Sequence, residues 1–181
     1  METTIYTLGH SNRSLEAFLE ILKAHGIRCV ADVRTISRSR HNPQFNADAL
    51  GPFLKSAGVH YTLLPRLGGL RKPRKDSRNL AWRNSSFRGF ADYMETEEFE
   101  EGLQELLRLA AKKKTAILCA EAVYWRCHRS LIADALLARG IPAMHIMSPS
   151  KAEPHRLTSF AKIEGLHVRY PAEQQTLYSD R

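Results

Sequence analysis

Short apolar runs, rich in β-branched residues, recur along the chain and are separated by longer stretches of mixed polarity. Runs of this kind, bounded by glycine or polar residues, are typical of buried strands. They predict five strands, at residues 4–8, 28–33, 59–64, 115–119 and 141–147, with the last one delayed by Pro142. A further short extended piece is predicted at 167–170.

Between these runs, apolar residues recur every three or four positions, which places them on one face of a helix. The clearest case follows Thr96, a suitable N-cap, with glutamates in the first turn and Lys112–Lys114 near the end, as the helix dipole favours. Because proline is tolerated only in the first turn, Pro52 predicts that the second helix starts near Gly51. The helices predicted in this way lie at 15–25, 51–57, 87–94, 97–110, 127–139 and around 157–164.

Strands that alternate with helices indicate a mainly parallel sheet covered on both faces. The sequence therefore predicts a single α/β domain over residues 1–181, with about five strands and helices on both sides. Residues 65–86 have no clear period and form a basic insertion that is longer than most loops in compact domains, a feature of functional or disordered loops.

The net charge of the chain indicates which class of partner it binds. The 181 residues carry 27 Lys and Arg against 19 Asp and Glu, a net charge of +8, which favours anionic ligands, nucleotides or nucleic acid. The stretch from Arg66 to Arg88 has eight cations against Asp76 alone. It is interpreted either as a mobile, solvated loop or as a nucleic-acid contact in which Trp82 and Phe87 stack on bases.

Two classes of protein are excluded at this stage. No run approaches the roughly 18–20 apolar residues of a membrane span, and the N-terminus does not resemble a secretory signal, so no membrane partner is expected. Cys29, Cys119 and Cys127 are too few for a disulfide scaffold and indicate a reducing compartment, the cytoplasm. The oligomeric state is left open.

Polar, titratable and glycine residues follow the predicted strands at their carboxyl ends, where open parallel sheets bind ligands. Residues predicted to bind the ligand are Gly9, His10, Ser11, Arg34, Arg38, Arg126 and Arg129. Residues predicted to act in catalysis are Glu121, His128, Cys119, Cys127 and Asp32. Asp32 and Arg34 face the same side of a strand, so an ion pair between them is the alternative to a role in catalysis.

The densest cluster, from Cys119 to Arg129, fits three chemistries or a purely structural role. A helix starting near Cys127 offers unpaired N–H groups to a phosphate or carboxylate. A cysteine at such a helix end beside His or Arg becomes a nucleophile, with Glu121 and His128 as acid–base partners. Metal binding is the third; with no Cys-x-x-Cys spacing, no metal ligand is assigned. Standard ATP and dinucleotide motifs are also absent from the sequence, and no cofactor is identified.

At these residues the sequence resembles the uncharacterised domain-of-unknown-function family 488. The resemblance rests on Thr7–Ser11, on Asp32–Arg34 with Ser39–Phe45, on the Gly58–Gly69 stretch, and on Leu118–Glu121 leading to Cys127–Arg129. It departs at Ile36-Ser37, where the family often has an aromatic residue and a proline. The resemblance implies a compact α/β domain with a polar cleft, and no established activity.

Three functions are therefore carried forward. The first is a hydrolase or transferase that binds and processes a phosphorylated ligand, a nucleotide or nucleic acid. The second is a binding module without chemistry that grips nucleic acid through its basic loops. The third is a redox or metal sensor that uses Cys119 and Cys127.

Overall fold

A computed structural model describes residues 2–173. Six strands form one sheet in the order β3-β2-β4-β1-β5-β6. The first five are parallel, and β6 joins the edge antiparallel to β5. The strands are β1 (Ile5–Gly9), β2 (Cys29–Asp32), β3 (His60–Leu63), β4 (Thr115–Cys119), β5 (Ala143–Ser148) and β6 (Lys151–Pro154). The predicted fold class is confirmed, and β6 is an addition to it.

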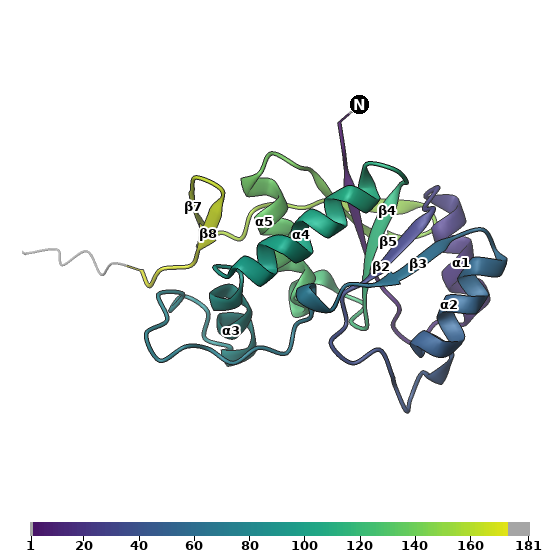
Figure 1. Cartoon of the computed structure of the whole chain (residues 1–181), viewed down its shortest axis with the longest axis horizontal. Helices are drawn as coiled ribbons and strands as arrows, with labels where there is room; N and C mark the ends of the chain where they lie inside the picture. The colour runs from purple at the N-terminus through teal and green to yellow at the C-terminus, as the bar shows by residue number, and fades with distance from the viewer. Residues whose placement is uncertain (1, 174–181) are drawn as a thin grey trace, which may run out of the picture.

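Helices cover both faces of the sheet (Figure 1). On one face α1 (Leu15–Ala24) and α2 (Ala47–Ser56) pack their apolar side chains against Leu8, Val30 and Leu118 of the strands. On the other face α3 (Ser85–Tyr93), α4 (Glu97–Ala110) and α5 (Arg129–Ala138) pack against Ala31 and Ile117. Nowhere in residues 2–173 is there a helix with the length and apolar character that a membrane span needs.

Helix capping follows the sequence at α1 and α4. The Ser14 hydroxyl accepts a hydrogen bond from the N–H of Ala17 at 3.1 Å, and the Thr96 hydroxyl accepts from Phe99 at 3.3 Å. These side chains satisfy backbone donors that the first turn leaves unpaired. Both helices therefore start where the sequence predicts.

The start predicted for α2, near Gly51, is wrong. The helix begins at Ala47 because the carbonyl of Asn46 accepts hydrogen bonds from Ala49 and Leu50, which is buried. Pro52 therefore sits inside the helix, where it lacks an N–H for the preceding turn. Pro52 is exposed, and burial of Leu50 and Leu54 on the opposite side holds the helix in place.

The helix predicted around 157–164 is also wrong. This segment lies against α5, where the N–H and hydroxyl of Thr158 donate to the two carboxylate oxygens of Asp134. Its end forms a hairpin of β7 (Lys162–Glu164) and β8 (His167–Arg169), turned at Gly165 with a φ of +65°. Tertiary hydrogen bonds to a buried carboxylate replace the local bonds that a helix would make.

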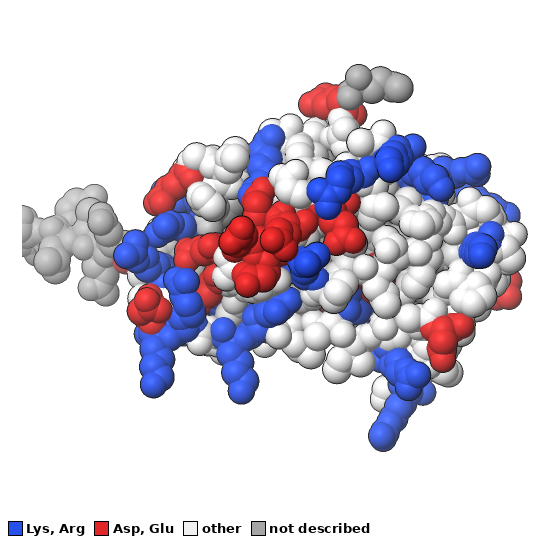
Figure 2. All heavy atoms as spheres, viewed as in Figure 1, with Lys and Arg blue, Asp and Glu red and all other residues white. Residues whose placement is uncertain are grey.

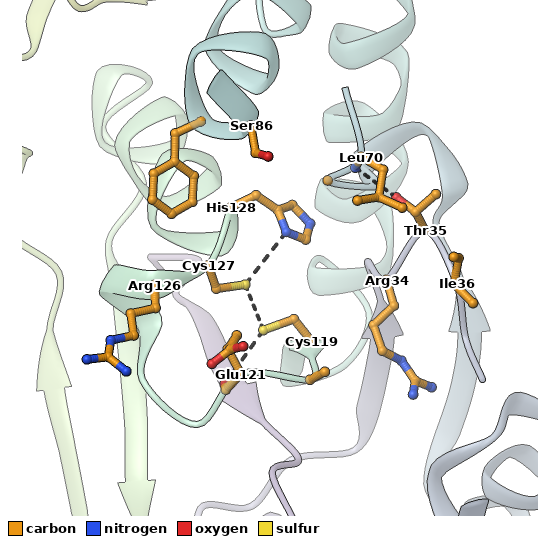
Figure 3. Close-up of a pocket in the computed structure, with 13 residues that line it drawn as sticks. Arg34, Thr35, Ile36, Leu70, Ser86, Cys119, Glu121, Arg126, Cys127 and His128 are labelled. Carbon is orange, nitrogen blue, oxygen red and sulfur yellow. Dashed lines mark hydrogen bonds between the residues drawn. The ribbon is translucent and has the colours of Figure 1, made fainter. Parts of the chain in front are cut away.

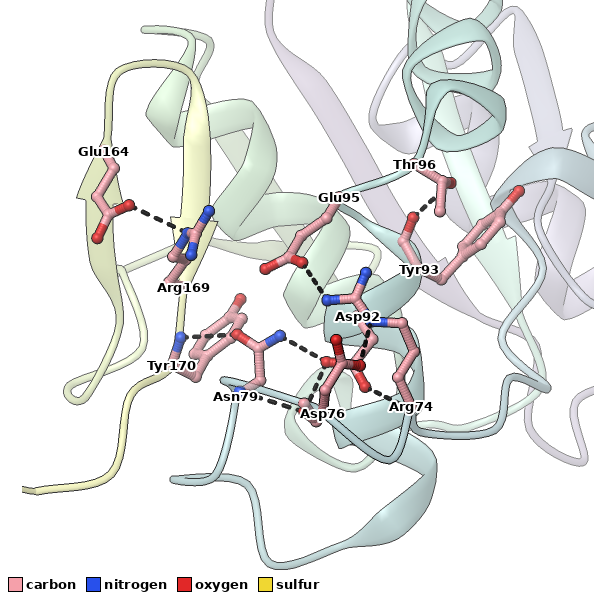
Figure 4. Close-up of polar contacts among 11 residues, drawn as sticks. Arg74, Asp76, Asn79, Asp92, Tyr93, Glu95, Thr96, Glu164, Arg169 and Tyr170 are labelled. Atoms are coloured by element: carbon pink, nitrogen blue, oxygen red, sulfur yellow. Dashed lines mark hydrogen bonds and ion pairs between the residues drawn. The ribbon is translucent and has the colours of Figure 1, made fainter.

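The basic insertion at 65–86 is an ordered loop fastened to α3 (Figure 4). The buried Asp92 accepts hydrogen bonds from the N–H of Arg74, the hydroxyl of Ser77 and the amide of Asn79 at 2.7–2.8 Å. Asn79 in turn accepts from the N–H of Tyr170 at 3.0 Å. The loop is therefore held to both α3 and the C-terminal segment, and the interpretation of it as a mobile loop is wrong.

The strand order puts the carboxyl ends of β1 and β4 at the centre of the sheet. From β1 the chain passes over the position of β4 to form β2 and β3, then returns to insert β4 beside β1. Ligands bind in open α/β sheets at such a reversal of strand order, outside the carboxyl ends. The segments that follow β1, β2 and β4 meet there.

Candidate active site

A cavity of about 300 Å³ opens beyond the carboxyl ends of β2 and β4 (Figure 3). Its wall combines the segment after β2, the glycine turn after η2 (Pro65–Leu67), the start of α3, and the connection from β4 to α5. The lining residues are Arg34, Thr35, Ile36, Gly69, Leu70, Ser86, Phe87, Cys119, Ala120, Glu121, Arg126, Cys127 and His128. Segments distant in sequence therefore contribute to a single concave surface.

Two cysteine side chains lie together in the cavity wall. Cys119 is the last residue of β4, and Cys127 follows η3 (Tyr124–Arg126) at the entrance to α5. Their sulfur atoms lie 2.8 Å apart and share a hydrogen bond, although both are free thiols. The short connection of residues 120–126 folds back, so that two cysteines eight residues apart in the sequence are in direct contact.

His128 is held in a fixed orientation beside this pair. Its Nε2 atom lies 3.0 Å from the carbonyl oxygens of both Val33 and Leu67, so Nε2 carries a hydrogen and donates it. Its Nδ1 atom lies 3.6 Å from the sulfur of Cys127. Because Nε2 is committed to the backbone, Nδ1 is the atom that exchanges a proton with the Cys127 thiol.

Several groups lower the pKa of Cys127 to about 4. In order of size, these are the hydrogen bond with Cys119, the hydrogen bond and charge of His128, and the positive charge of Arg129; burial opposes them. The N–H of Arg129, in the first turn of α5, also points at the Cys127 sulfur from 3.5 Å. A helix N-terminus stabilises an anion, and here the anion is the Cys127 thiolate.

Cys119 behaves in the opposite way. Burial, together with the hydrogen bond to Cys127 and its charge, raises the pKa of Cys119 well above the usual value. The opposite directions of the two pKa shifts favour Cys127 as the thiolate and Cys119 as the protonated partner. The site thus holds one nucleophilic sulfur and one protonated sulfur in contact.

Arg129 lies behind the cavity wall with its guanidinium buried. Its Nη2 donates to the carbonyl oxygens of Glu121 and Ala122 at 2.9 and 3.1 Å. Among residues 2–173, its Nε and Nη1 atoms have no hydrogen-bond partner. The side chain therefore holds the 121–122 turn in place and supplies a positive charge close to the thiol pair.

Two glycines are required by close packing around the site. A Cβ atom at Gly9 would lie 1.6 Å from the carbonyl oxygen of Glu121, and one at Gly69 would lie 2.5 Å from Nδ1 of His128. Real Cβ atoms do not approach other atoms so closely. Gly9 therefore lets the turn after β4 pack on β1, and Gly69 leaves room for the imidazole ring.

Asp32 and Arg34 form a buried ion pair beside the cavity. Arg34 donates from Nη2 to Oδ2 of Asp32 at 2.7 Å and from Nε to Oδ1 at 2.9 Å, and Tyr61 donates its hydroxyl to Oδ2 at 2.5 Å. Nη1 of Arg34 lies 3.3 Å from Nε2 of His10, whose pKa is lowered by burial. The predicted alternative for Asp32, an ion pair with Arg34, is therefore the one that the structure shows. The buried carboxylate of Asp32 accepts hydrogen bonds from Arg34 and Tyr61 on its two oxygen atoms.

The structure brings together only part of the predicted site. Six of the predicted residues line the cavity: Arg34, Cys119, Glu121, Arg126, Cys127 and His128. Six others do not: Gly9, His10, Ser11, Asp32, Arg38 and Arg129. We carry none of the second group into the proposed reaction, except for the charge and the loop contact of Arg129.

Several lining residues were missed by sequence reasoning. Ile36 and Leu70 are 64% and 66% exposed at the mouth, and Ser86 enters from the first turn of α3. They belong to irregular segments or to a helix end, where no periodic signal indicates which side chains face the cavity. The glycine pair Gly68-Gly69 is typical of a turn, but it does not indicate the contact of Gly69 with His128.

Charge is distributed unevenly around the cavity. Acidic side chains gather over α4, whereas Lys and Arg side chains project from the lower edge of the view in Figure 2. At the cavity itself, Arg126 and Glu121 are both exposed. In Figure 3 the guanidinium groups of Arg126 and Arg34 lie on opposite sides of the sulfur pair and point away from it.

The prediction that Trp82 and Phe87 stack on bases is not supported by their packing. Trp82 contacts Phe87, Phe160 and Tyr170 at ring-centroid distances of 4.8–5.5 Å. Both rings therefore contribute to the apolar contact between the basic loop, α3 and the C-terminal segment. Within residues 2–173, no group of three or more His, Cys, Asp or Glu side chains is arranged to hold a metal ion.

Comparison with known protein families identifies the family of this chain. The model of the family described as domain of unknown function DUF488 matches residues 14–136, about two thirds of the sequence. The chain belongs to this family. All 13 residues that line the cavity of this DUF488 protein lie within the matched region. The Thr7–Ser11 segment, which contributed to the resemblance, lies outside it.

Other comparisons add no further relative of this DUF488 domain. Searches of curated proteins and of solved structures found no match.

Proposed function

We propose that this DUF488 protein is an enzyme, a hydrolase or transferase, that uses the Cys127 thiolate as a nucleophile on a phosphorylated ligand of nucleotide size. The observation that carries the proposal is the Cys127–His128 pair in the wall of a cavity. Nucleophilic cysteines are activated by a neighbouring base and a helix N-terminus, and Cys127 has both. A volume of about 300 Å³ is at the lower end of the range for small-molecule sites.

The side chains in the cavity have distinct roles in the proposed reaction. The Cys127 sulfur attacks an electrophilic atom of the ligand, and the bond to the leaving group breaks as Nδ1 of His128 gives it a proton. In the second step the exposed Glu121 carboxylate takes a proton from water, and the water oxygen displaces the ligand from sulfur. An acceptor hydroxyl in place of water makes the same site a transferase.

The shape and charge of the cavity support a ligand with an apolar portion and an anionic portion. Ile36 and Leu70 offer apolar contact for a base or sugar. Arg126 is exposed at the mouth and forms no ion pair within the described part of the chain, so it can turn toward a phosphate. Paired hydrogen bonds from a guanidinium favour phosphate over neutral groups.

A cytoplasmic location is part of the proposal. A thiolate nucleophile has to stay reduced, and the cytoplasm keeps thiols in that state. In support, Cys29, Cys119 and Cys127 are all free, even though two of them are in contact.

Ligand binding is tested with a panel of nucleotides and short oligonucleotides in thermal and urea unfolding. A true ligand at 100 times its dissociation constant is expected to add about 2.7 kcal/mol to the free energy of unfolding. Arg126→Ala should lose most of this gain, because it removes the phosphate contact. Arg28→Ala, an exposed arginine before the amino end of β2, is the matched control and should keep it.

Turnover is tested with the ligands that stabilise. Cys127→Ser should keep the stabilisation but lose product formation and any covalent adduct seen by intact mass. Product formation by Cys127→Ser at the wild-type rate would contradict the proposal, as would a panel in which no phosphorylated compound stabilises the protein.

Nucleic-acid binding without chemistry is the second candidate, and one observation favours it. Lys72, Lys75, Arg78 and Arg83 of the basic loop are exposed and form no ion pair with any residue in the 2–173 range. Arg40 is likewise exposed in the segment that follows β2. Contacts of this kind neutralise phosphates and release counterions.

This candidate is tested by the salt dependence of oligonucleotide binding. Each phosphate contact contributes a slope of about −0.9 in log K against log salt on duplex DNA. Replacing Lys72 and Lys75 together by Ala should reduce the slope by about 2. Fluorescence anisotropy measures both quantities, and an affinity that is insensitive to salt would exclude this candidate.

A further inference from the structure

The contact between Cys119 and Cys127 has no role in the proposed hydrolase or transferase reaction beyond lowering a pKa. Any hydroxyl or amide donor near the thiolate would do that. A second thiol at this position adds something that other donors do not have: it can itself attack a sulfur atom attached to Cys127. Three features of the Cys119–Cys127 pair decide whether Cys119 can make this attack.

The first is distance. The two sulfur atoms lie 2.8 Å apart, and a disulfide bond is about 2.05 Å long, so closure requires a movement of less than about 1 Å. Cys119 ends a central strand and Cys127 enters a helix through the short turn η3, so the movement falls on a loop.

The second is access. The cavity reaches both cysteines, yet each is almost fully buried, 2% exposed for Cys119 and 6% for Cys127. Cys127 carries the negative charge, so an electrophile that enters the cavity reacts with Cys127 first. Cys119 stays behind it, protonated, as the second thiol of an ordered pair.

The third is what happens to Cys119 once Cys127 has reacted. Two of the causes that raise the pKa of Cys119 are the hydrogen bond to Cys127 and the charge of Cys127. Both disappear when the Cys127 sulfur becomes neutral in a covalent bond, while the nearby charge of Arg129, which lowers the pKa of Cys119, remains. Formation of the first bond therefore activates the second thiol.

We propose that Cys119 and Cys127 form a redox-active dithiol that exchanges with small disulfides carrying carboxylate groups, Cys127 being the attacking thiol and Cys119 the resolving one. This inference rests on the proposed role of Cys127 as a nucleophile, and it adds a substrate class for the same site. The preference for a negatively charged disulfide comes from Arg126 at the mouth of the cavity.

The exchange balances without any other reactant. The Cys127 thiolate attacks one sulfur of the disulfide RSSR, forms a mixed disulfide and releases RS⁻. Cys119 then loses its proton to the departing RS⁻ and attacks the Cys127 sulfur, which releases the second RS⁻. This second RS⁻ takes the proton that Nδ1 of His128 received from Cys127. The protein gains one disulfide bond and loses two hydrogens, while RSSR is reduced to two RSH. Excess RSH reverses both steps.

The experiment uses oxidised glutathione on the full-length protein, followed by intact mass and peptide mapping. The wild type is expected to lose two hydrogens and show a Cys119–Cys127 disulfide with no retained glutathione. Cys119→Ser is expected to stop at a glutathione adduct on Cys127 that persists at least about 100-fold longer, because an internal thiol acts at a very high effective concentration. Cys29→Ser, which replaces a buried cysteine outside the cavity, should behave like the wild type.

Charge selectivity is measured in the same format. Cystamine, a disulfide that carries amines, should react more slowly than oxidised glutathione. Arg126→Ala should reduce the difference between the two reaction rates. Equal rates for the two disulfides in the wild type would overturn the assigned substrate class.

Other outcomes separate this inference from the proposed function. A wild-type protein that accumulates a stable glutathione adduct on Cys127 overturns the resolving role of Cys119 but leaves Cys127 a nucleophile. If oxidised glutathione does not react while iodoacetamide modifies Cys127, the role of Cys119 as resolving thiol is overturned, but Cys127 is still a nucleophile. If iodoacetamide does not modify Cys127 either, both the inference and the proposed function fail.

Discussion

Asp32→Asn is expected to lower the free energy of unfolding by about 3–5 kcal/mol. The substitution leaves the Arg34 guanidinium buried without a carboxylate, and breaking a buried ion pair from one side costs about this much. Arg34 donates to both carboxylate oxygens and is 7% exposed, so water cannot replace the lost partner. The loss is measured as a shift in urea unfolding at constant m-value.

The matched control is Asp48→Asn, which makes the same change in an exposed pair. Asp48 lies 3.9 Å from Arg38, and the two side chains are 72% and 77% exposed. Exposed pairs of this kind contribute about 0–1 kcal/mol. If Asp32→Asn is no more destabilising than Asp48→Asn, the Asp32–Arg34 pair does not support the cavity wall as described.

The second large effect is expected from His128→Gln, which should raise the pKa of Cys127 by about 2 units. The substitution removes the charge of His128 and the Nδ1 hydrogen bond, two of the causes that lower the pKa of Cys127. Hydrogen bonds to charged groups contribute about 1.5–3 kcal/mol, and 1.36 kcal/mol corresponds to one pKa unit. The glutamine amide can still donate to the carbonyls of Val33 and Leu67, which limits the damage to the fold.

The expected shift is measured from the pH dependence of iodoacetamide alkylation at Cys127. Only the thiolate reacts, so the rate rises as pH increases through the pKa, and the variant curve should lie at higher pH than the wild-type curve. His25→Gln is the control, since Nε2 of His25 also pairs with a backbone carbonyl, that of Ser148, outside the cavity. Coincident curves for His128→Gln and wild type would show that the imidazole does not stabilise the thiolate.

Much of the fold follows from local patterns. The apolar runs at 115–119 and the helix after Thr96 appear where periodicity and capping place them, since these signals lie within a few residues of each other. The start of α2 and the segment after Leu157 were mispredicted for a common reason. In both, burial or hydrogen bonds to residues distant in the chain override the local preference, as at Leu50 and at Asp134.

For the site, the sequence predicts only which residues lie at the carboxyl ends of strands, and not how their side chains contact one another. Cys119 ends β4, and Glu121 and Cys127 follow it; all three are predicted at the same edge of the sheet, and all three line the cavity. Their contacts depend on the fold of residues 120–126, which has no periodic signal. The inward orientation of Arg129 and the contact of Gly69 with His128 likewise depend on packing between elements.

The most direct test is the pH dependence of alkylation at Cys127 in the wild-type protein, with each cysteine followed by peptide mapping. Cys127 is expected to react at a constant rate from neutral pH down to pH 5, with a midpoint at about 4, while Cys29 stays unmodified and Cys119 is not modified before Cys127. A midpoint near 8.5, the value of an ordinary thiol, would contradict the thiolate and with it the proposed chemistry of the cavity.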